Sequence, residues 1–201
     1  MKQIFEITDE KDIKEVLDGA SYGTLALCED EKPYSVPINF VEYEKKIYFH
    51  GSFKGKKADI LKKNKFASFS VVEPCALIPS YFSSNEGLAC PATHFFKSVI
   101  IDGVIEFVEN KDEKIKALTK LMQKLQPEGN YKPLSKNEYE KILNATFVYK
   151  LIPTSIKVKF KFGQHLSKER FDMIINNLEK RGSKTDMKTV EFMKIFKDKT
   201  V

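Results

Sequence analysis

Long apolar runs are missing from this sequence of 201 residues, and so is the apolar stretch of a secretory signal. No segment approaches the roughly 18 consecutive apolar residues that a membrane-spanning helix needs. The first twenty residues instead carry charges every few positions, which is unlike a secretion signal. We therefore expect a soluble protein of the cytoplasm with no membrane partner.

Cysteine is also scarce. Cys28, Cys75 and Cys90 form no C-x-x-C pair, and an odd count without a secretion signal argues for reduced thiols rather than a disulfide framework. Cys90 and His94 form a C-x-x-x-H pair, but two ligands without a second pair fall short of a zinc set. We expect no metal.

Material for a packed core is abundant, because 42% of the residues are hydrophobic and 12% are aromatic. This composition excludes an intrinsically disordered chain. The length is long for one core and short for two full ones. We expect a barrel domain over residues 1–158 and a helical extension over 159–201 that packs on the barrel.

Positive charge is concentrated in one short segment. The formal net charge is +6, and residues 51–65 carry most of the local excess, with Asp59 as the only acidic residue among lysines at 54, 56, 57, 62, 63 and 65. These lysines lie beside glycines and a strand end, and they do not follow one helix face interleaved with stacking aromatics. We therefore expect no nucleic-acid partner.

Apolar patterning predicts a mainly β protein with α additions, of the α+β class. Short connections join most of the expected strands, which favours an antiparallel six-stranded split β-barrel with peripheral helices and a C-terminal helical tail over a parallel sheet. The expected strands are 23–28, 34–41, 47–50, 66–72, 95–108 and 146–159. Helices are expected between Asp9 and Gly19 and at 56–64, 112–125, 135–143, 167–180 and 186–197.

Two features of this pattern suggest a ligand site. Pro37 removes a backbone donor from its strand, so it must lie at an edge, at a bulge, or beside something other than a strand, such as a ligand. Residues 73–94 contain three prolines and a glycine and are expected to form an irregular excursion, of the kind that often covers a site.

The segment His50-Gly-Ser-Phe-Lys-Gly-Lys-Lys57 is the most informative one. It leaves a strand, passes two glycines and a hydroxyl, and enters a helix whose first turn carries two lysines. Helix N-terminal amides and cations can hold a phosphate there. A solvated surface turn explains the same residues equally well, and neither a Walker motif nor a dinucleotide fingerprint is present.

Four blocks in order resemble the pyridoxamine 5'-phosphate oxidase-like, FMN-binding split-barrel superfamily, nearest to its nitroimidazole-resistance flavoprotein branch. Residues 96–99 (FKSV) resemble a later block of that family, in which Lys97 replaces the more common arginine and loses its bidentate fork. The four blocks are YGTLAL at 22–27, PYSVPINF at 33–40, IYFHGS at 47–52 and GKK at 55–57 with Asn64.

The resemblance implies FMN as cofactor, bound at the interface of a homodimer. The flavin ring would lie along Pro37, Ile38, Asn39 and Phe40. The phosphate would sit on Ser52, Lys56 and Lys57, next to Gly51. Lys97 and Ser98 would complete the site, and His50 would either touch the flavin or substrate, as a catalytic candidate, or merely cap its strand.

The function this predicts is that of an FMN-dependent oxidoreductase, similar to flavin or nitro reductases, which passes electrons from a reduced nicotinamide to a small acceptor. The cofactor would perform the chemistry, so no acid and base pair need appear in the sequence. The alternative is a non-catalytic flavin or haem carrier, or a redox-responsive regulator, because fold alone does not separate these classes.

Overall fold

The computed structural model describes residues 3–198 and divides the chain into two compact units. One unit holds Lys14–Val71 and Val99–Lys157. The other holds the N-terminal segment up to Ile13, Val72–Ser98 and the segment from Val158 onward. The barrel at 1–158 and the extension at 159–201 stay a prediction. Within residues 3–198 no helix is long and apolar enough to cross a membrane.

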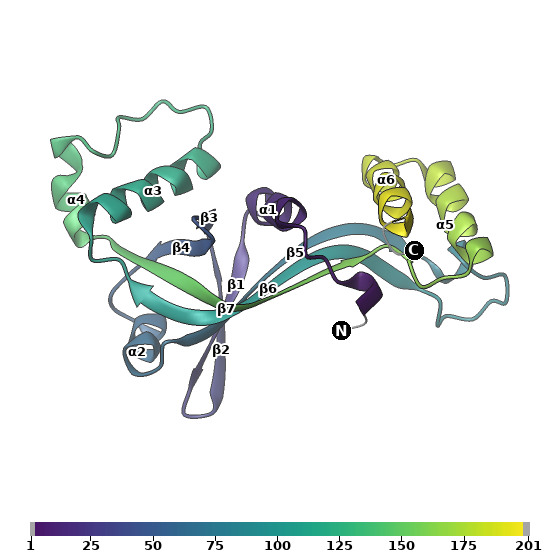
Figure 1. Cartoon of the computed structure of the whole chain (residues 1–201), viewed down its shortest axis with the longest axis horizontal. Coiled ribbons are helices and arrows are strands. Elements are labelled where there is room, and N and C mark those ends of the chain that lie inside the picture. The colour runs from purple at the N-terminus through teal and green to yellow at the C-terminus, as the bar shows by residue number, and fades with distance from the viewer. Residues whose placement is uncertain (1–2, 199–201) are drawn as a thin grey trace. The chain divides into compact units, whose positions relative to one another are not determined.

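A seven-stranded sheet organises the chain in the order β2-β1-β5-β6-β7-β4-β3 (Figure 1). The described pairings of β1 with β2 and β5, and of β4 with β3 and β7, are antiparallel, which confirms the expected class. Pro37 lies in an edge strand, where a missing donor is tolerated. The strands are β1 (Gly23–Glu29), β2 (Lys32–Ile38), β3 (Val41–Tyr43), β4 (Lys46–Gly51), β5 (Phe66–Ile78), β6 (Thr93–Phe107) and β7 (Phe147–Lys161).

The seventh strand arises because the expected strand at 34–41 is interrupted. Asn39 and Phe40 lie in neither strand, and β3 begins at Val41. Phe40 is fully buried with its ring edge-on to Phe69 at 4.8 Å, while Asn39 donates its amide to the Ser21 carbonyl at 3.1 Å. These two contacts hold the chain in a bend. The alternation of apolar and polar residues does not predict that bend.

The expected excursion at 73–94 is wrong in extent, because β5 continues to Ile78 and β6 already begins at Thr93. β1 pairs with β5 only through Ser68–Ser70, so Pro74 lies beyond the end of that pairing. A proline there costs no ladder hydrogen bond with β1. The irregular connection is therefore limited to residues 79–92, which include a short 3-10 turn at Ser80–Phe82.

The larger unit is closed by helices that pack on its strands. α3 packs on β3 and β4 and contributes Ala117 and Leu121 to a core cluster with Tyr48 and Val148. Its first turn is capped by the Asn110 side chain, which accepts from the Glu113 amide at 2.9 Å. The helices that lie in this unit are α2 (Lys56–Lys63), α3 (Lys111–Leu125) and α4 (Glu140–Ala145), together with the part of α1 (Glu10–Gly19) from Lys14 onward.

The smaller unit contains two helices side by side, α5 (Lys168–Arg181) and α6 (Lys184–Asp198) (Figure 1). Phe162, just after β7, stacks on Phe196 of α6 at 5.6 Å. Gly182 ends α5 in the left-handed conformation, with φ of 69°. The carboxylate of Asp186, which is only 1% exposed, accepts from the Arg181 Nε at 2.9 Å and joins the two helices.

Candidate functional site

The connection from β4 to α2 is shaped by two glycines. Gly51 is the last residue of β4, and Gly55 precedes the first residue of α2 with φ of 102° and ψ of 169°. L side chains rarely adopt this backbone conformation, so glycine is required at position 55. Gly55 has no side chain to cap the helix, and the first amides of α2 are left for another acceptor.

Lys57 places a cation against this loop. Its ammonium lies 5.3 Å from the ring centre of Phe49 and 5.6 Å from that of Tyr149. A Cβ at Gly51 would lie 2.5 Å from the Lys57 Nζ, so a side chain at position 51 would displace it. Partial burial lowers the pKa of Lys57. Within residues 3–198 no carboxylate forms an ion pair with this lysine, and its charge is available to an anion.

Ser52 and Lys56 complete the loop. The Ser52 carbonyl accepts from the Tyr149 hydroxyl at 3.1 Å, and its Oγ accepts from the Lys54 amide at 3.0 Å. The Ser52 hydroxyl keeps its own hydrogen for a further acceptor. Lys56 is exposed, with its ammonium 4.8 Å from the Tyr34 ring centre. The loop thus presents one hydroxyl, two ammonium groups and free helix amides, which is a donor set for a phosphate monoester.

His50 lies directly before this loop, opposite Val148 in the β4–β7 ladder, and its residue is exposed. Desolvation of its ring and the charge of Lys57 lower the pKa of His50. Both effects favour the neutral ring, in which one nitrogen can donate and the other can accept.

The segment Pro37–Phe40 presents its side chains unequally. Ile38 and Phe40 are buried in the core, at 7% and 0% exposure, whereas Pro37 is exposed and Asn39 is half-buried. Ile38 and Phe40 therefore support the strand from behind. Contact with a flat ring would come from the main chain and from Pro37 and Asn39.

Lys97 and Ser98 belong to the smaller unit, unlike the other predicted site residues. The Lys97 ammonium lies 3.6 Å from the Phe192 ring centre and 3.8 Å from the Glu73 carboxylate, and its side chain is only 2% exposed. The Ser98 hydroxyl donates to the Lys159 carbonyl at 3.5 Å. Within that unit both residues have structural partners of their own.

Two residues that support the loop were missed by sequence reasoning. Phe49 and Tyr149 are directly opposite in the β4–β7 ladder, and their rings stack at 5.1 Å with an interplanar angle of 5°. The Lys57 ammonium lies over both rings. The alternating pattern predicts both strands, but only the register between them places these rings together.

The chain belongs to the pyridoxamine 5'-phosphate oxidase family, whose model matches residues 9–160. This range covers every residue of the β4–α2 loop and both candidate residues in the smaller unit. No curated protein sequence matches this chain.

Several solved structures share the fold. A candidate 5-nitroimidazole antibiotic resistance protein from Bacteroides thetaiotaomicron is 20% identical, with a TM-score of 0.61 over 77% of this chain and 85% of that one. The FAD and haem binding protein from Mycobacterium smegmatis is 22% identical, with a TM-score of 0.64 over 78% and 73%. The flavocytochrome Anf3 from Azotobacter vinelandii is 21% identical, with a TM-score of 0.67 over 80% and 72%. The split-barrel fold is thus one on which flavin-binding proteins are built.

Proposed function

We propose that this protein binds FMN through the β4–α2 loop and acts as an FMN-dependent oxidoreductase. Electrons would pass from a reduced nicotinamide, NADH or NADPH, to a small acceptor such as a nitroaromatic or quinone-like compound. The observation that carries the proposal is the half-buried ammonium of Lys57, which has no carboxylate partner among residues 3–198 and lies beside uncapped helix amides.

FMN fits this loop better than a neutral ligand does. Its phosphate ester carries close to two negative charges at neutral pH, and two lysines with the positive end of a helix offer matching charge. Partial burial costs the Lys57 ammonium part of its hydration, which the attraction of the two aromatic rings offsets only in part. An incoming phosphate would remove that cost.

The chain's own residues hold and orient the cofactor in this proposal. Ser52, Lys56 and Lys57 bind the phosphate, and the Pro37–Phe40 main chain lies along the ring. The neutral His50 can donate or accept one hydrogen bond at the ring or at a substrate. Bound FMN supplies hydride and single-electron transfer, so the protein needs no acid and base pair of its own.

A homodimer in the cytoplasm remains part of the proposal. Family membership favours a shared site, in which a second copy would cover the flavin. Sedimentation of the purified protein at micromolar concentration checks this, and a monomer that still binds FMN tightly would contradict the shared site.

The decisive experiment removes the two cations of the loop. Lys56→Met together with Lys57→Met should weaken FMN binding by about 2 to 4 kcal/mol, because each charge-assisted hydrogen bond contributes about 1.5 to 3 kcal/mol and the two are not fully additive. Quenching of FMN fluorescence during titration measures the affinity.

Lys63→Met is the matched control. It removes one lysine charge, against two in the double variant, from the other end of α2, about 10 Å along the helix axis. Lys63 is 66% exposed and pairs with Glu29 at 2.8 Å, an exposed pair that contributes little to stability. An unchanged FMN affinity in the double variant, or an equal loss in the control, would remove the phosphate assignment.

A carrier or redox-responsive regulator is the second candidate, because two structural neighbours are described as binding haem or as flavocytochromes. The absorption spectrum of freshly purified protein separates the cases. Flavin bands that bleach with NADH or NADPH and return with an acceptor indicate an enzyme. Flavin bands without turnover indicate a carrier, and a Soret band indicates haem.

A further inference from the structure

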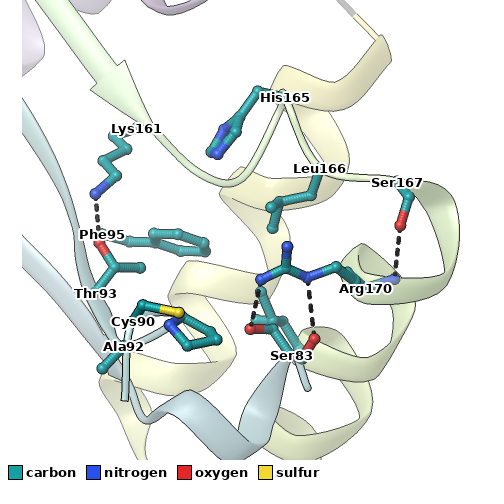
Figure 2. A pocket seen from close by; sticks show the side chains of 12 residues that line it. Ser83, Cys90, Ala92, Thr93, Phe95, Lys161, His165, Leu166, Ser167 and Arg170 are labelled. Carbon is teal, nitrogen blue, oxygen red and sulfur yellow. Dashed lines mark hydrogen bonds between the residues drawn. The ribbon is translucent and has the colours of Figure 1, made fainter. Parts of the chain in front are cut away.

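A cavity of about 470 Å³ lies within the smaller unit, where the 79–92 connection meets the segment between β7 and α5. Its walls come from both ends of the connection and from residues 161–174 (Figure 2). This volume is within the range of about 300 to 1,000 Å³ that is usual for small-molecule sites. The proposed FMN loop contributes none of the residues that line it.

Two cationic side chains from different elements point into this cavity. Arg170 of α5 is held by Ser83, whose carbonyl accepts from Nε at 3.1 Å and whose Oγ accepts from Nη2 at 3.4 Å. Lys161 at the end of β7 donates to the Thr93 hydroxyl. Figure 2 shows the third guanidinium nitrogen of Arg170 directed away from Ser83.

Glu86 and Glu169 line an adjoining hollow that shares Arg170, but no acidic side chain of the described residues lines this cavity itself. Within residues 3–198 neither Lys161 nor Arg170 forms an ion pair. Partial burial and the neighbouring Lys159 lower the pKa of Lys161. Cations that line a cavity without forming an ion pair favour an anionic occupant.

Three apolar side chains form part of the remaining wall, beside polar residues such as Thr93 and Ser167. Phe95 and Ile174 are each 1% exposed, and Leu166 lies beside the Arg170 guanidinium in Figure 2. A fully hydrated inorganic ion would leave this surface without a partner. An organic anion would match both the cationic and the apolar side chains of the cavity, with its charge at the cations and its apolar body against the apolar side chains.

We propose that this cavity is a second ligand site, specific for a small organic carboxylate with a flat apolar body. Arg170 binds the carboxylate through the guanidinium edge that Ser83 leaves available, and Lys161 supplies the second charge. Ser83 is a positioning residue, because it fixes the guanidinium plane without itself needing to touch the ligand. His165 forms part of the rim, with its ring edge-on to Phe5 at 5.3 Å.

The probe is 2-naphthoate, and its neutral partner is 2-naphthamide. Calorimetric titration of the full-length protein should show naphthoate binding at least about tenfold more tightly than the amide, since a charge-assisted hydrogen bond is worth a factor of ten or more. Lys161→Met should weaken naphthoate binding by about tenfold to one-hundredfold and leave the weak binding of the amide unchanged. Lys168→Met is the control, because it also removes one lysine charge, from the start of α5, but Lys168 does not line the cavity.

Cys90 reports the location of the ligand independently. It lines the cavity and is exposed, whereas Cys28 is equally exposed but belongs to the other unit. Saturating naphthoate should slow the reaction of Cys90 with a neutral maleimide, measured by mass spectrometry, without slowing that of Cys28. This measurement needs no variant, so it remains valid even if Lys161→Met fails to fold.

Each contrary result overturns the proposal in a distinct way. Equal affinity for naphthoate and naphthamide would show that Arg170 and Lys161 do not bind the negative charge of the carboxylate. Unchanged binding in Lys161→Met, or unprotected Cys90, places the ligand elsewhere. Displacement of naphthoate by FMN would assign the cavity to the flavin and reject a second site, whereas failure of FMN to bind at all would leave this cavity's test intact.

Discussion

Gly55→Ala is the most direct test of how the loop holds its shape. The added methyl group meets nothing within 4 Å, so any effect comes from the backbone and not from a collision. With φ of 102° and ψ of 169°, Gly55 occupies a region that is essentially restricted to glycine. An alanine must either accept that strain or rotate the loop away from α2.

The expected cost is about 1 to 3 kcal/mol in the free energy of unfolding, the usual range for a residue forced into such a region. For a protein of this size that corresponds to a fall in Tm of roughly 2 to 12 °C. Rotation of the loop would also move Ser52 and the first amides of α2 apart. We therefore expect FMN to bind at least about tenfold more weakly, through the loss of one or more charge-assisted hydrogen bonds.

Urea denaturation followed by circular dichroism measures the stability, and FMN fluorescence quenching measures the affinity. Gly19→Ala is the matched control, since it also meets nothing within 4 Å but lies at the end of α1 without a positive φ. It should stabilise the protein by about 0.4 to 1 kcal/mol. A Gly55→Ala protein as stable as the wild type would refute the backbone argument, and one that loses stability but keeps its FMN affinity would refute the phosphate site alone.

Three further outcomes are expected. Gly103→Ala should cost at least about 1 to 3 kcal/mol in urea denaturation, because its Cβ would collide with a backbone carbonyl of β7 that cannot move aside as a side chain can. Hydrogen bonds from Arg181 and from Ser183 lower the pKa of Asp186 from 3.8 to about 2, so the stabilisation that this carboxylate provides, about 2 to 3 kcal/mol, is present above pH 4 and lost as the pH falls towards 2; Asp186→Asn should flatten that part of the curve of stability against pH. Tyr149→Phe removes the hydroxyl that donates to the Ser52 carbonyl and should cost about 0.5 to 1.5 kcal/mol of stability as well as FMN affinity, and an unchanged affinity would show that this bond does not hold the loop.

Local features of the sequence predicted most of the fold. The glycines at 51 and 55 mark the loop, and the apolar spacing after Lys57 predicts α2, which the structure confirms at Lys56–Lys63. These features depend on residues close together in the chain. Short-range backbone preferences determine them, so they can be read without knowledge of the partner strands.

Non-local contacts account for the features that were not predicted. Taken from the sequence alone, Pro74 argues against a strand, because proline cannot donate a backbone hydrogen bond. In the structure the pairing of β5 with β1 ends at Ser70, so Pro74 removes no hydrogen bond to β1. Likewise, the apolar character of Phe40 predicts a continuous strand. Its contact with the Phe69 ring, from another strand, instead takes it out of the ladder.

The chemistry of Lys57 combines both kinds of information. Sequence places the lysine in the first turn of a helix beside glycines, which allows either a solvated turn or a phosphate site. The strand register then puts Phe49 and Tyr149 beneath it, and their rings withdraw the ammonium from water. A solvated surface lysine would keep its ordinary pKa, whereas burial lowers that of Lys57. The register that sequence could not supply is therefore what favours the phosphate site over a solvated turn.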